Sequence, residues 1–310
     1  MPNISPDLLK AHLAMFTVAL LYGANYSVAK VVLDEPSYIE PFGFILIRML
    51  LAGLLLFILQ RIFIKERVEK GDFPRLILCG LFGSSINMMF FFAGLKATTP
   101  INASLMMTMT PILVLLISAF LIKERITGRK LLGILFGGVG AVILIIYGKK
   151  FAYTTAIGDL YVLINALSYG VYIVLVKKLM QKYHPITVIM WVLCFGFFLT
   201  LPFGAQDMAA ADYASFPPVV WAAVVYVVIG ATFLTYTLNA TALRTVNPSV
   251  VSIYIYLQPL IAAFISLFFG SETLSPQKIL AGILIFIGVY LVSKSSKKRI
   301  EEAQKISKTK

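Results

Sequence analysis

Long apolar runs separated by short polar stretches make up most of this sequence. Most runs reach the roughly 17–25 residues that a helix needs to cross a bilayer. They lack the strict apolar–polar alternation of membrane-spanning strands, and a helix satisfies its own backbone hydrogen bonds in lipid. We therefore predict an all-α polytopic membrane protein with ten transmembrane helices. The predicted spans are 11–33, 39–60, 74–95, 100–122, 130–148, 157–177, 186–203, 218–240, 247–269 and 277–293.

The second half of the sequence repeats the first. A constant shift of 148 positions aligns 99–144 with 247–292 without a gap. The anchors of this alignment are Pro100 and Pro248, Ser104 and Ser252, Pro111 and Pro259, Phe120 and Phe268, Glu124 and Glu272, and Gly140 and Gly288. A shift of 147 aligns Tyr22-Gly23 with Tyr169-Gly170 and Lys30 with Lys177. Duplicated helical units of this kind are common among membrane carriers.

Basic residues collect in alternate connections between the runs. They lie mainly in 61–75, 123–130 and 177–184 and after the last run, whereas 204–217 carries two aspartates and no base. The positive-inside rule therefore predicts that both termini are cytoplasmic.

Five spans in each copy is an odd number, so the copies must enter the membrane from opposite faces. We predict two inverted five-helix repeats, 11–148 and 157–293, followed by a basic cytoplasmic tail, 294–310.

The composition agrees with a membrane protein. Hydrophobic residues make up 59% of the chain and charged residues 13%, whereas charged residues approach a quarter of soluble domains. The net charge of +13 does not indicate nucleic acid, because the bases lie between apolar runs rather than on one face. Cys79 and Cys194 both fall inside apolar runs, so they indicate neither a disulfide framework nor a metal site.

Arg48 is the one unambiguous ion well inside a predicted span. Its insertion costs about 2.5–3.5 kcal/mol on translocon scales, which makes a function worth considering. It is a candidate counter-ion for an anionic solute group. The alternative is structural: Arg48 binds loop carbonyls or helix C-termini, or it extends toward the outer interface.

Uncharged polar and aromatic residues gather near the midpoints of several spans. If these helices surround a common cavity, the residues form a lining suited to amphiphilic organic solutes. The alternative is that they hydrogen-bond between helices and serve only packing. The candidate solute contacts are Tyr22, Asn25, Asn87, Thr110, Tyr169, Tyr172, Tyr236, Tyr254 and Gln258.

Pro111 and Pro259 occupy equivalent positions halfway along two spans. Proline removes a backbone hydrogen bond and favours a kink, and matching interruptions in two halves indicate a midplane site and moving elements. We predict hinges at both. His12 and His184 lie near predicted cytoplasmic ends, and we interpret them as interfacial.

Sequence signatures of catalysis are missing. The chain has no phosphate-binding Gly-rich loop, no His-Glu-x-x-His zinc motif and no Gly-x-Ser-x-Gly elbow. We therefore expect no catalytic residues, no cofactor and no bound metal.

Several motifs together resemble the EamA-type transporters of the drug/metabolite transporter superfamily. They are Leu-Tyr-Gly-Ala-Asn-Tyr (21–26), Pro41 with Arg48, the run 94–104, Thr-Pro (110–111) and Lys-Glu-Arg-Ile-Thr (123–127), echoed at 247–252, 258–259 and 271–275. The resemblance covers about 11–293. Tyr22 departs from it, since the family more often has Trp there.

The resemblance implies a multi-pass carrier or facilitator in the cell inner membrane. Its implied substrates are small organic metabolites, amino-acid-like compounds or drugs, moved by alternating access, with the solute and the lipid bilayer as its partners. It specifies neither one substrate nor an oligomeric state. A membrane-embedded enzyme acting on lipid-linked substrates is the alternative, and a non-transporting receptor is a third.

Overall fold

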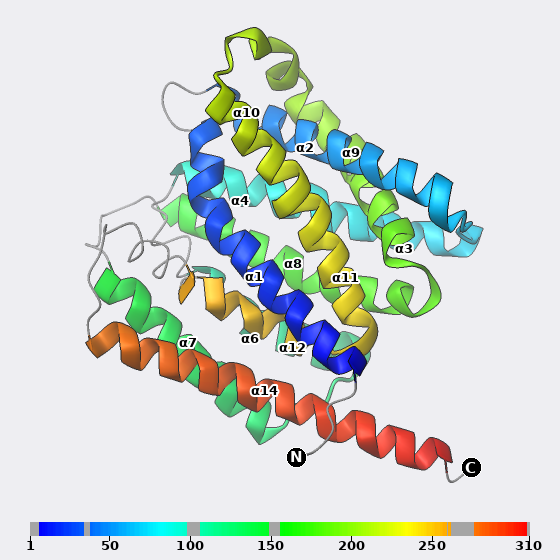
Figure 1. Cartoon of the computed structure of the whole chain (residues 1–310), viewed down its shortest axis with the longest axis vertical. Coiled ribbons are helices and arrows are strands. Elements are labelled where there is room, and N and C mark those ends of the chain that lie inside the picture. The colour runs from blue at the N-terminus through cyan, green and yellow to red at the C-terminus, as the bar shows by residue number, and fades with distance from the viewer. Residues whose placement is uncertain are drawn as a thin grey trace.

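A computed structural model describes residues 6–33, 38–97, 106–148, 156–258, 260–261 and 276–308. Within these residues the chain is helical and has no strand (Figure 1). The described part holds six helices long and apolar enough to cross a membrane, and two shorter apolar helices, Thr110–Ile122 and Ile279–Val292. The predicted all-α class is therefore confirmed, and each predicted range contains helix.

The helices follow the predicted order along the chain. The first half contains α1 (Pro6–Leu33), α2 (Pro41–Leu59) with a π segment (Gln60–Ile64), a 3-10 turn (Lys70–Asp72), α3 (Phe73–Gly80), a π segment (Leu81–Ser85), α4 (Ile86–Ala97), α6 (Thr110–Ile122) and α7 (Gly128–Gly148). The second half contains α8 (Ala156–Lys182), α9 (Pro185–Ala210), a 3-10 turn (Tyr213–Ser215), α10 (Pro218–Val225), a π segment (Tyr226–Leu234), α11 (Thr235–Thr245), α12 (Pro248–Ile253), a 3-10 turn (Tyr254–Tyr256) and α14 (Pro276–Lys308).

Prolines mark many of the helix starts. Pro41, Pro185, Pro218 and Pro248 each stand in the first turn of a helix, where the missing N–H is not needed. Several helices run beyond their predicted apolar ranges, and α14 continues through the predicted tail to Lys308. Lys, Glu and Gln are good helix formers, so a helix does not end where hydrophobicity ends.

Matching helices of the two halves pair with each other. The second helices, α2 and α9, pack together, as do the last helices, α7 and α14. The third span of each half packs on the first helix of the other, α4 on α8 and α11 on α1. Each helix of one half thus packs on the helix of the other half that a two-fold axis between the halves would place beside it. Figure 1 shows α7 beside α14, with the start of α1 and the end of α14 at one end of the bundle.

The paired helices run antiparallel. A Cβ on Gly133 of α7 would lie 2.8 Å from the carbonyl oxygen of Gly288, and one on Gly140 would lie 2.7 Å from that of Ala281. The contact therefore moves toward lower numbers on α14 as it moves toward higher numbers on α7. Equivalent helices of opposite direction are what an inverted repeat requires. Small residues allow the two backbones to approach this closely.

A π segment interrupts the third span of each half. Leu81–Ser85 separates α3 from α4, and Tyr226–Leu234 separates α10 from α11. Their glycines, Gly83 and Gly230, are 147 positions apart, like Tyr22 and Tyr169. π turns often occur at functional sites, and each of these accepts a hydrogen bond from a side chain of the other half.

Polar side chains also join the two halves at the end of the bundle where α2 ends. Lys182 Nζ lies 2.5 Å from Glu69 Oε2 and 2.7 Å from Asp72 Oδ2. The Tyr183 hydroxyl donates to the same Asp72 oxygen. Exposed ion pairs each contribute little, but this group fixes the 3-10 turn of the first half against the end of α8.

A buried ion pair lies at the connection from α6 to α7. Lys130 Nζ lies 2.5 Å from Glu124 Oε1, and both side chains are almost fully enclosed. Ser249 of α12 donates to the same carboxylate oxygen, which ties this connection to the second half. Removing one partner of such a pair leaves an uncompensated buried charge and costs about 3–5 kcal/mol.

The contact between α7 and α14 gives a stability prediction. A Cβ on Gly288 would lie 2.6 Å from the Gly133 carbonyl oxygen, so Gly288→Ala must push two backbones apart. We expect the midpoint of thermal unfolding to fall by about 3 °C or more. Gly282→Ala on the same helix is the control, because its Cβ would meet only Leu260 Cδ1 at 3.4 Å. Equal effects of the two substitutions would contradict the close contact.

His184 gives a pH prediction. It is the N-cap of α9, and its Nδ1 accepts from Ile186 N at 3.3 Å. Partial burial, and then the charge of Arg244, lower the pKa of His184, while Glu66 acts in the opposite direction. The unfolded chain therefore takes up the proton first, and the stability that the cap contributes is present above about pH 6.5 and lost below it.

His184→Asn keeps a capping acceptor that does not titrate. Between pH 7.5 and pH 5.5 we expect the unfolding midpoint of the unchanged protein to fall about 1–2 °C further than that of the variant. Parallel pH profiles of the two proteins would show that the imidazole has no such role.

Candidate functional site

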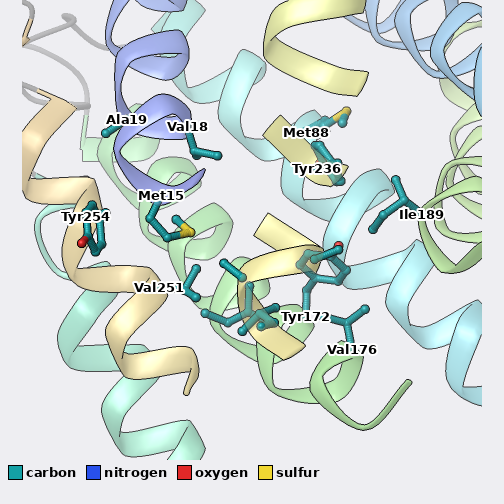
Figure 2. Close-up of a cluster of buried hydrophobic side chains, with 14 of the residues drawn as sticks. Met15, Val18, Ala19, Met88, Tyr172, Val176, Ile189, Tyr236, Val251 and Tyr254 are labelled. Atoms are coloured by element: carbon teal, nitrogen blue, oxygen red, sulfur yellow. The ribbon is translucent and has the colours of Figure 1, made fainter. Parts of the chain in front are cut away.

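A cavity of about 100 Å³ lies between the two halves, lined by α1, α2, α4, α8, α11 and the region around Tyr254–Tyr256. Figure 2 shows Met15 and Val18 projecting from α1, with Met88 and Tyr236 across from them. The residues that line it are Met15, Val18, Ala19, Tyr22, Asn25, Arg48, Asn87, Met88, Phe91, Phe92, Met107, Asn165, Tyr169, Tyr236, Asn239, Val251, Tyr254, Ile255 and Gln258.

Most of the candidate solute contacts meet at this cavity. They come from both halves and from positions more than 230 residues apart along the chain. The predicted residues that line it are Tyr22, Asn25, Asn87, Tyr169, Tyr236, Tyr254 and Gln258, together with the candidate counter-ion Arg48. The structure thus gathers these side chains in one place, and their contact with a solute stays a prediction.

Two of the predicted solute contacts, Tyr172 and Thr110, are not among the residues that line this cavity. Tyr172 lies behind the wall, with its ring centroid 6.3 Å from those of Tyr169 and Tyr236, and its ring fills the space left by Gly83. Thr110 is fully buried at the start of α6, and its Oγ1 has no hydrogen-bond partner in the described part of the chain. Which side chains of a helix line the cavity depends on the rotation of that helix, which sequence position alone does not reveal.

The two predicted hinges fare differently. Pro111 stands in the first turn of α6, directly after a turn at 108–109, so the break in the helix precedes the proline. Pro111 therefore starts a helix rather than bending a continuous one. Pro259 lies outside the described residues. Motion at either position stays a prediction.

Arg48 is buried and bonds across the interface between the halves. Its Nε donates to Thr232 Oγ1 at 3.0 Å and its Nη2 to the Ala231 carbonyl oxygen at 3.3 Å. The guanidinium carbon lies 5.6 Å from the centre of the Phe92 ring. Ion pairs of the described residues do not include Arg48. The positive charge therefore faces the cavity without a carboxylate to neutralise it in this part of the chain.

Tyr236 makes the reverse connection. This residue of the second half donates its hydroxyl to the Gly83 carbonyl oxygen of the first half at 2.7 Å. Arg48 of the first half bonds to the π segment Tyr226–Leu234, and Tyr236 bonds to the π segment Leu81–Ser85. Each half thus supplies a carbonyl from its π segment to a polar side chain of the other.

Two asparagines hold α4 and α8 together at the cavity. Asn165 Nδ2 donates to the Asn87 carbonyl oxygen at 2.7 Å, and Asn87 Nδ2 donates to the Asn165 carbonyl oxygen at 3.3 Å. This reciprocal pair uses both amide nitrogens, so it orients both side-chain oxygens. The pair thus joins the two helices, and contact of Asn87 with a solute stays a prediction.

The apolar part of the wall was not predicted. Met15, Met88 and Met107 with Phe91 and Phe92 contribute thioether and aromatic surface, which adapts to apolar groups of varied shape. A further polar residue was missed, Asn239. The signal for it was present, because Asn239 follows Tyr236 by three positions and so shares its helix face.

His12, in the N-terminal half of α1, contacts the lining residue Tyr254. Its Nδ1 lies 2.7 Å from the Tyr254 hydroxyl, and the His12 ring is half-buried. This contact links α1 to the 3-10 turn Tyr254–Tyr256. Among the described residues, no cluster of His, Cys, Asp and Glu has the composition of a metal site.

Comparison with known families gives the chain its classification. The model of the EamA-like transporter family matches twice, at residues 9–146 and 156–294. The chain belongs to the EamA-like transporter family. The two matches coincide with the two halves that exchange helix partners, and this EamA protein is a multi-pass membrane protein.

Relatives of this EamA protein are named as transporters. An "Uncharacterized transporter" of Archaeoglobus fulgidus is 28% identical, over 92% of this chain and 97% of the relative. An "Uncharacterized inner membrane transporter YicL" of Salmonella typhimurium is 23% identical, over 95% and 98%. A "Probable terminal-alkyne amino-acid exporter" of Streptantibioticus cattleyicolor is 24% identical, over 77% and 79%.

A solved crystal structure shares the fold. It superposes with a TM-score of 0.73 at 23% identity, and the match covers 92% of this chain and 98% of that chain.

The Tyr236 contact can be tested by removing one hydroxyl. Tyr236→Phe deletes the hydrogen bond to Gly83, so we expect the unfolding midpoint to fall by about 2–4 °C. Tyr169→Phe is the matched control, because the Tyr169 hydroxyl makes no hydrogen bond to a described residue. A loss of stability in Tyr169→Phe as large as that in Tyr236→Phe would contradict the role given to this contact.

Proposed function

We propose that this EamA protein is a secondary transporter that carries small organic solutes across the cell inner membrane by alternating access. The solute classes are metabolites, amino-acid-like compounds or drugs. The observation that carries the proposal is a cavity between the halves whose wall contains a buried guanidinium without a neutralising carboxylate among its described lining. Buried ionisable groups within a membrane usually belong to a substrate pathway.

The arrangement of the helices supports alternating access. Ten transmembrane helices in two inverted repeats, 11–148 and 157–293, would place the solute on the axis between them. The antiparallel pairing of α7 with α14 supports this symmetry. Rocking of one half against the other would then expose the cavity to each face in turn.

The orientation follows from charge. The 65–70 connection and the end of α8 both carry lysine, and they lie at the end of the bundle where α1 begins (Figure 1). The positive-inside rule assigns this end, with both termini, to the cytoplasm.

Arg48 is the residue that binds an anionic group of the solute. Its hydrogen bonds to Thr232 and Ala231 hold the guanidinium in place, and a fork of donors fixed in this way suits a carboxylate. We therefore propose that Arg48 has both roles considered from the sequence: it bonds to protein groups and it binds the anionic group of the solute. Pro111 is a proposed hinge because it begins α6 directly after the turn at 108–109. Pro259 is the second proposed hinge because it occupies the equivalent position of the repeat.

The alternative function, an enzyme acting on lipid-linked substrates, is not favoured by the relatives, which are named as transporters.

The experiment that tests the proposal is solute flux in proteoliposomes. Purified protein is reconstituted and uptake of a labelled metabolite panel is measured by counterflow, with and without a proton gradient. At least one small organic solute should exchange faster than in empty vesicles. The absence of flux for every solute, in vesicles whose protein is shown to be folded by its thermal unfolding transition, would remove the proposal.

Arg48 substitutions give the residue-level prediction. Arg48→Gln keeps hydrogen-bond donors but removes the charge, so we expect uptake of carboxylate-bearing solutes to fall at least about tenfold. Arg48→Lys keeps the charge without the fork and should retain intermediate activity. Unfolding midpoints of both variants control for folding. Unchanged uptake by Arg48→Gln would assign Arg48 to packing alone.

A further inference from the structure

The connection from α6 to α7 carries exposed positive charge that no described carboxylate neutralises. Lys123, Arg125 and Arg129 are exposed, and none of them forms an ion pair with a described residue. The one acid of this connection, Glu124, is paired with Lys130, and both side chains are almost fully enclosed. Its charge is therefore used inside the protein, and three exposed bases remain.

The connection from α2 to α3 is also basic, but it brings its own acids. Residues 61–72 contain four bases, as residues 123–130 do, together with three acids rather than one. An anion that approached this connection would meet repulsion as well as attraction, so the surplus of positive charge is larger between α6 and α7. The charged residues of 61–72 are Arg61, Lys65, Glu66, Arg67, Glu69, Lys70 and Asp72.

Lys123 has a backbone conformation that is unusual for lysine. Its φ is 53° at the C-cap of α6, in the left-handed region that glycine and asparagine adopt most readily. Lys65, at the C-cap of the π segment Gln60–Ile64, is the other described residue besides glycine with a positive φ. A cation at a helix C-terminus is favoured by the helix dipole. The two lysines thus share backbone and charge but differ in their surroundings.

Helix α14 places a fourth exposed base beside the start of α7. A Cβ on Gly133 of α7 would lie 2.7 Å from Val292 Cγ2, and Lys294 follows two residues later. Because α7 and α14 are antiparallel, Lys294 lies toward the end of the pair where α7 begins (Figure 1). Lys294 Nζ lies 3.2 Å from the Tyr290 hydroxyl and 5.4 Å from the centre of its ring. The exposed bases therefore come from both halves.

The surface next to these bases is apolar. On α14, Phe286 and Tyr290 are more than half exposed, and on α7 Leu132 is half exposed. Tyrosine and lysine side by side at the end of an apolar helix face are typical of the level of the lipid headgroups. The bases thus lie where the apolar, lipid-facing surface ends.

We propose that Lys123, Arg125, Arg129 and Lys294 bind the headgroup of an anionic phospholipid. Guanidinium groups donate paired hydrogen bonds to phosphate oxygens, and the acyl chains lie along the exposed apolar faces of α7 and α14. A zwitterionic headgroup fits less well, because the bases repel its ammonium group. The site lies outside the cavity and does not depend on which solute is carried.

A lipid at this site stabilises a junction between the halves. The α6–α7 connection is tied to α12 because Ser249 donates to Glu124. Binding to the folded protein alone raises the unfolding midpoint. Thermal unfolding in detergent therefore measures occupancy of the site.

The experiment compares two lipids with the same acyl chains, dioleoyl phosphatidylglycerol and dioleoyl phosphatidylcholine, added at equal concentrations to the purified protein. Phosphatidylglycerol should raise the unfolding midpoint by at least about 3 °C more than phosphatidylcholine does, and salt should reduce this difference. Equal stabilisation by the two lipids would overturn the proposal.

A triple variant removes the charge without changing the backbone. Lys123→Asn keeps a residue that tolerates the left-handed conformation, and Arg125→Gln and Arg129→Gln keep polar, exposed side chains. We expect the difference between the lipids to fall below about 1 °C and the concentration of phosphatidylglycerol for half its effect to rise at least about tenfold. If the triple variant shows no unfolding transition, Arg125→Gln and Arg129→Gln are measured singly.

The matched control makes the same three changes around the other left-handed lysine. Arg61→Gln, Lys65→Asn and Arg67→Gln together remove equal charge, and we expect this variant to keep most of the response to phosphatidylglycerol. Equal losses in the two triple variants would show that total charge matters rather than this site, and would overturn the proposal.

The contribution of α14 is tested by Lys294→Gln. This variant should need at least about threefold more phosphatidylglycerol for half its effect, and an unchanged requirement would contradict a site shared by both halves.

Two soluble anions, glycerol 3-phosphate and hexaglutamate, test the identity of the occupant. Neither offers acyl chains to the apolar faces, so neither should stabilise the protein at the concentrations at which phosphatidylglycerol does. Stabilisation by either of them as large as that by phosphatidylglycerol would overturn a lipid as the occupant.

Discussion

The structure depends on the need to satisfy polar groups where no water is available. Lipid offers no hydrogen bonds, so a buried guanidinium or phenol must find its partners within the protein. Here the partners come from the opposite half. Arg48 bonds to Ala231 and Thr232, and Tyr236 bonds to the Gly83 carbonyl. Both acceptor regions are π segments, in which the regular ladder of backbone hydrogen bonds is shifted.

Because of these hydrogen bonds, the cavity is both the candidate site and part of the interface between the halves. Arg48 and Tyr236, two of the proposed solute contacts, also hold the halves together, so under the proposed function a bound solute would act directly on the interface between them. The end of the bundle near α2's C-terminus is also closed by polar contacts, from Lys182 to Glu69 and Asp72. These pairs are exposed, so each stabilises the closed end only weakly.

Much of the fold could be predicted because the bilayer imposes simple rules. Apolar length predicted the helices, proline marked several of their starts, and the family comparison confirmed two related halves. The polar inventory of the site was also readable, because polar residues are costly in lipid and stand out in an apolar run. The misses have a common cause. Tyr172 lies next to the wall residue Tyr236 without lining the cavity and Thr110 is buried elsewhere, whereas Asn239 lines the cavity unpredicted.

In a soluble protein the apolar stripe of a helix shows which face is buried. In a membrane that signal disappears, because lipid and protein interior are equally apolar. The sequence by itself therefore determined the helical class, the duplication and the presence of an ion and several amides within the membrane. Only the tertiary structure decided which faces turn inward, that Arg48 and Tyr236 bond across the halves, and that asparagines of four helices line one cavity. Those facts depend on helix rotation and pairing, which a uniformly apolar segment does not encode locally.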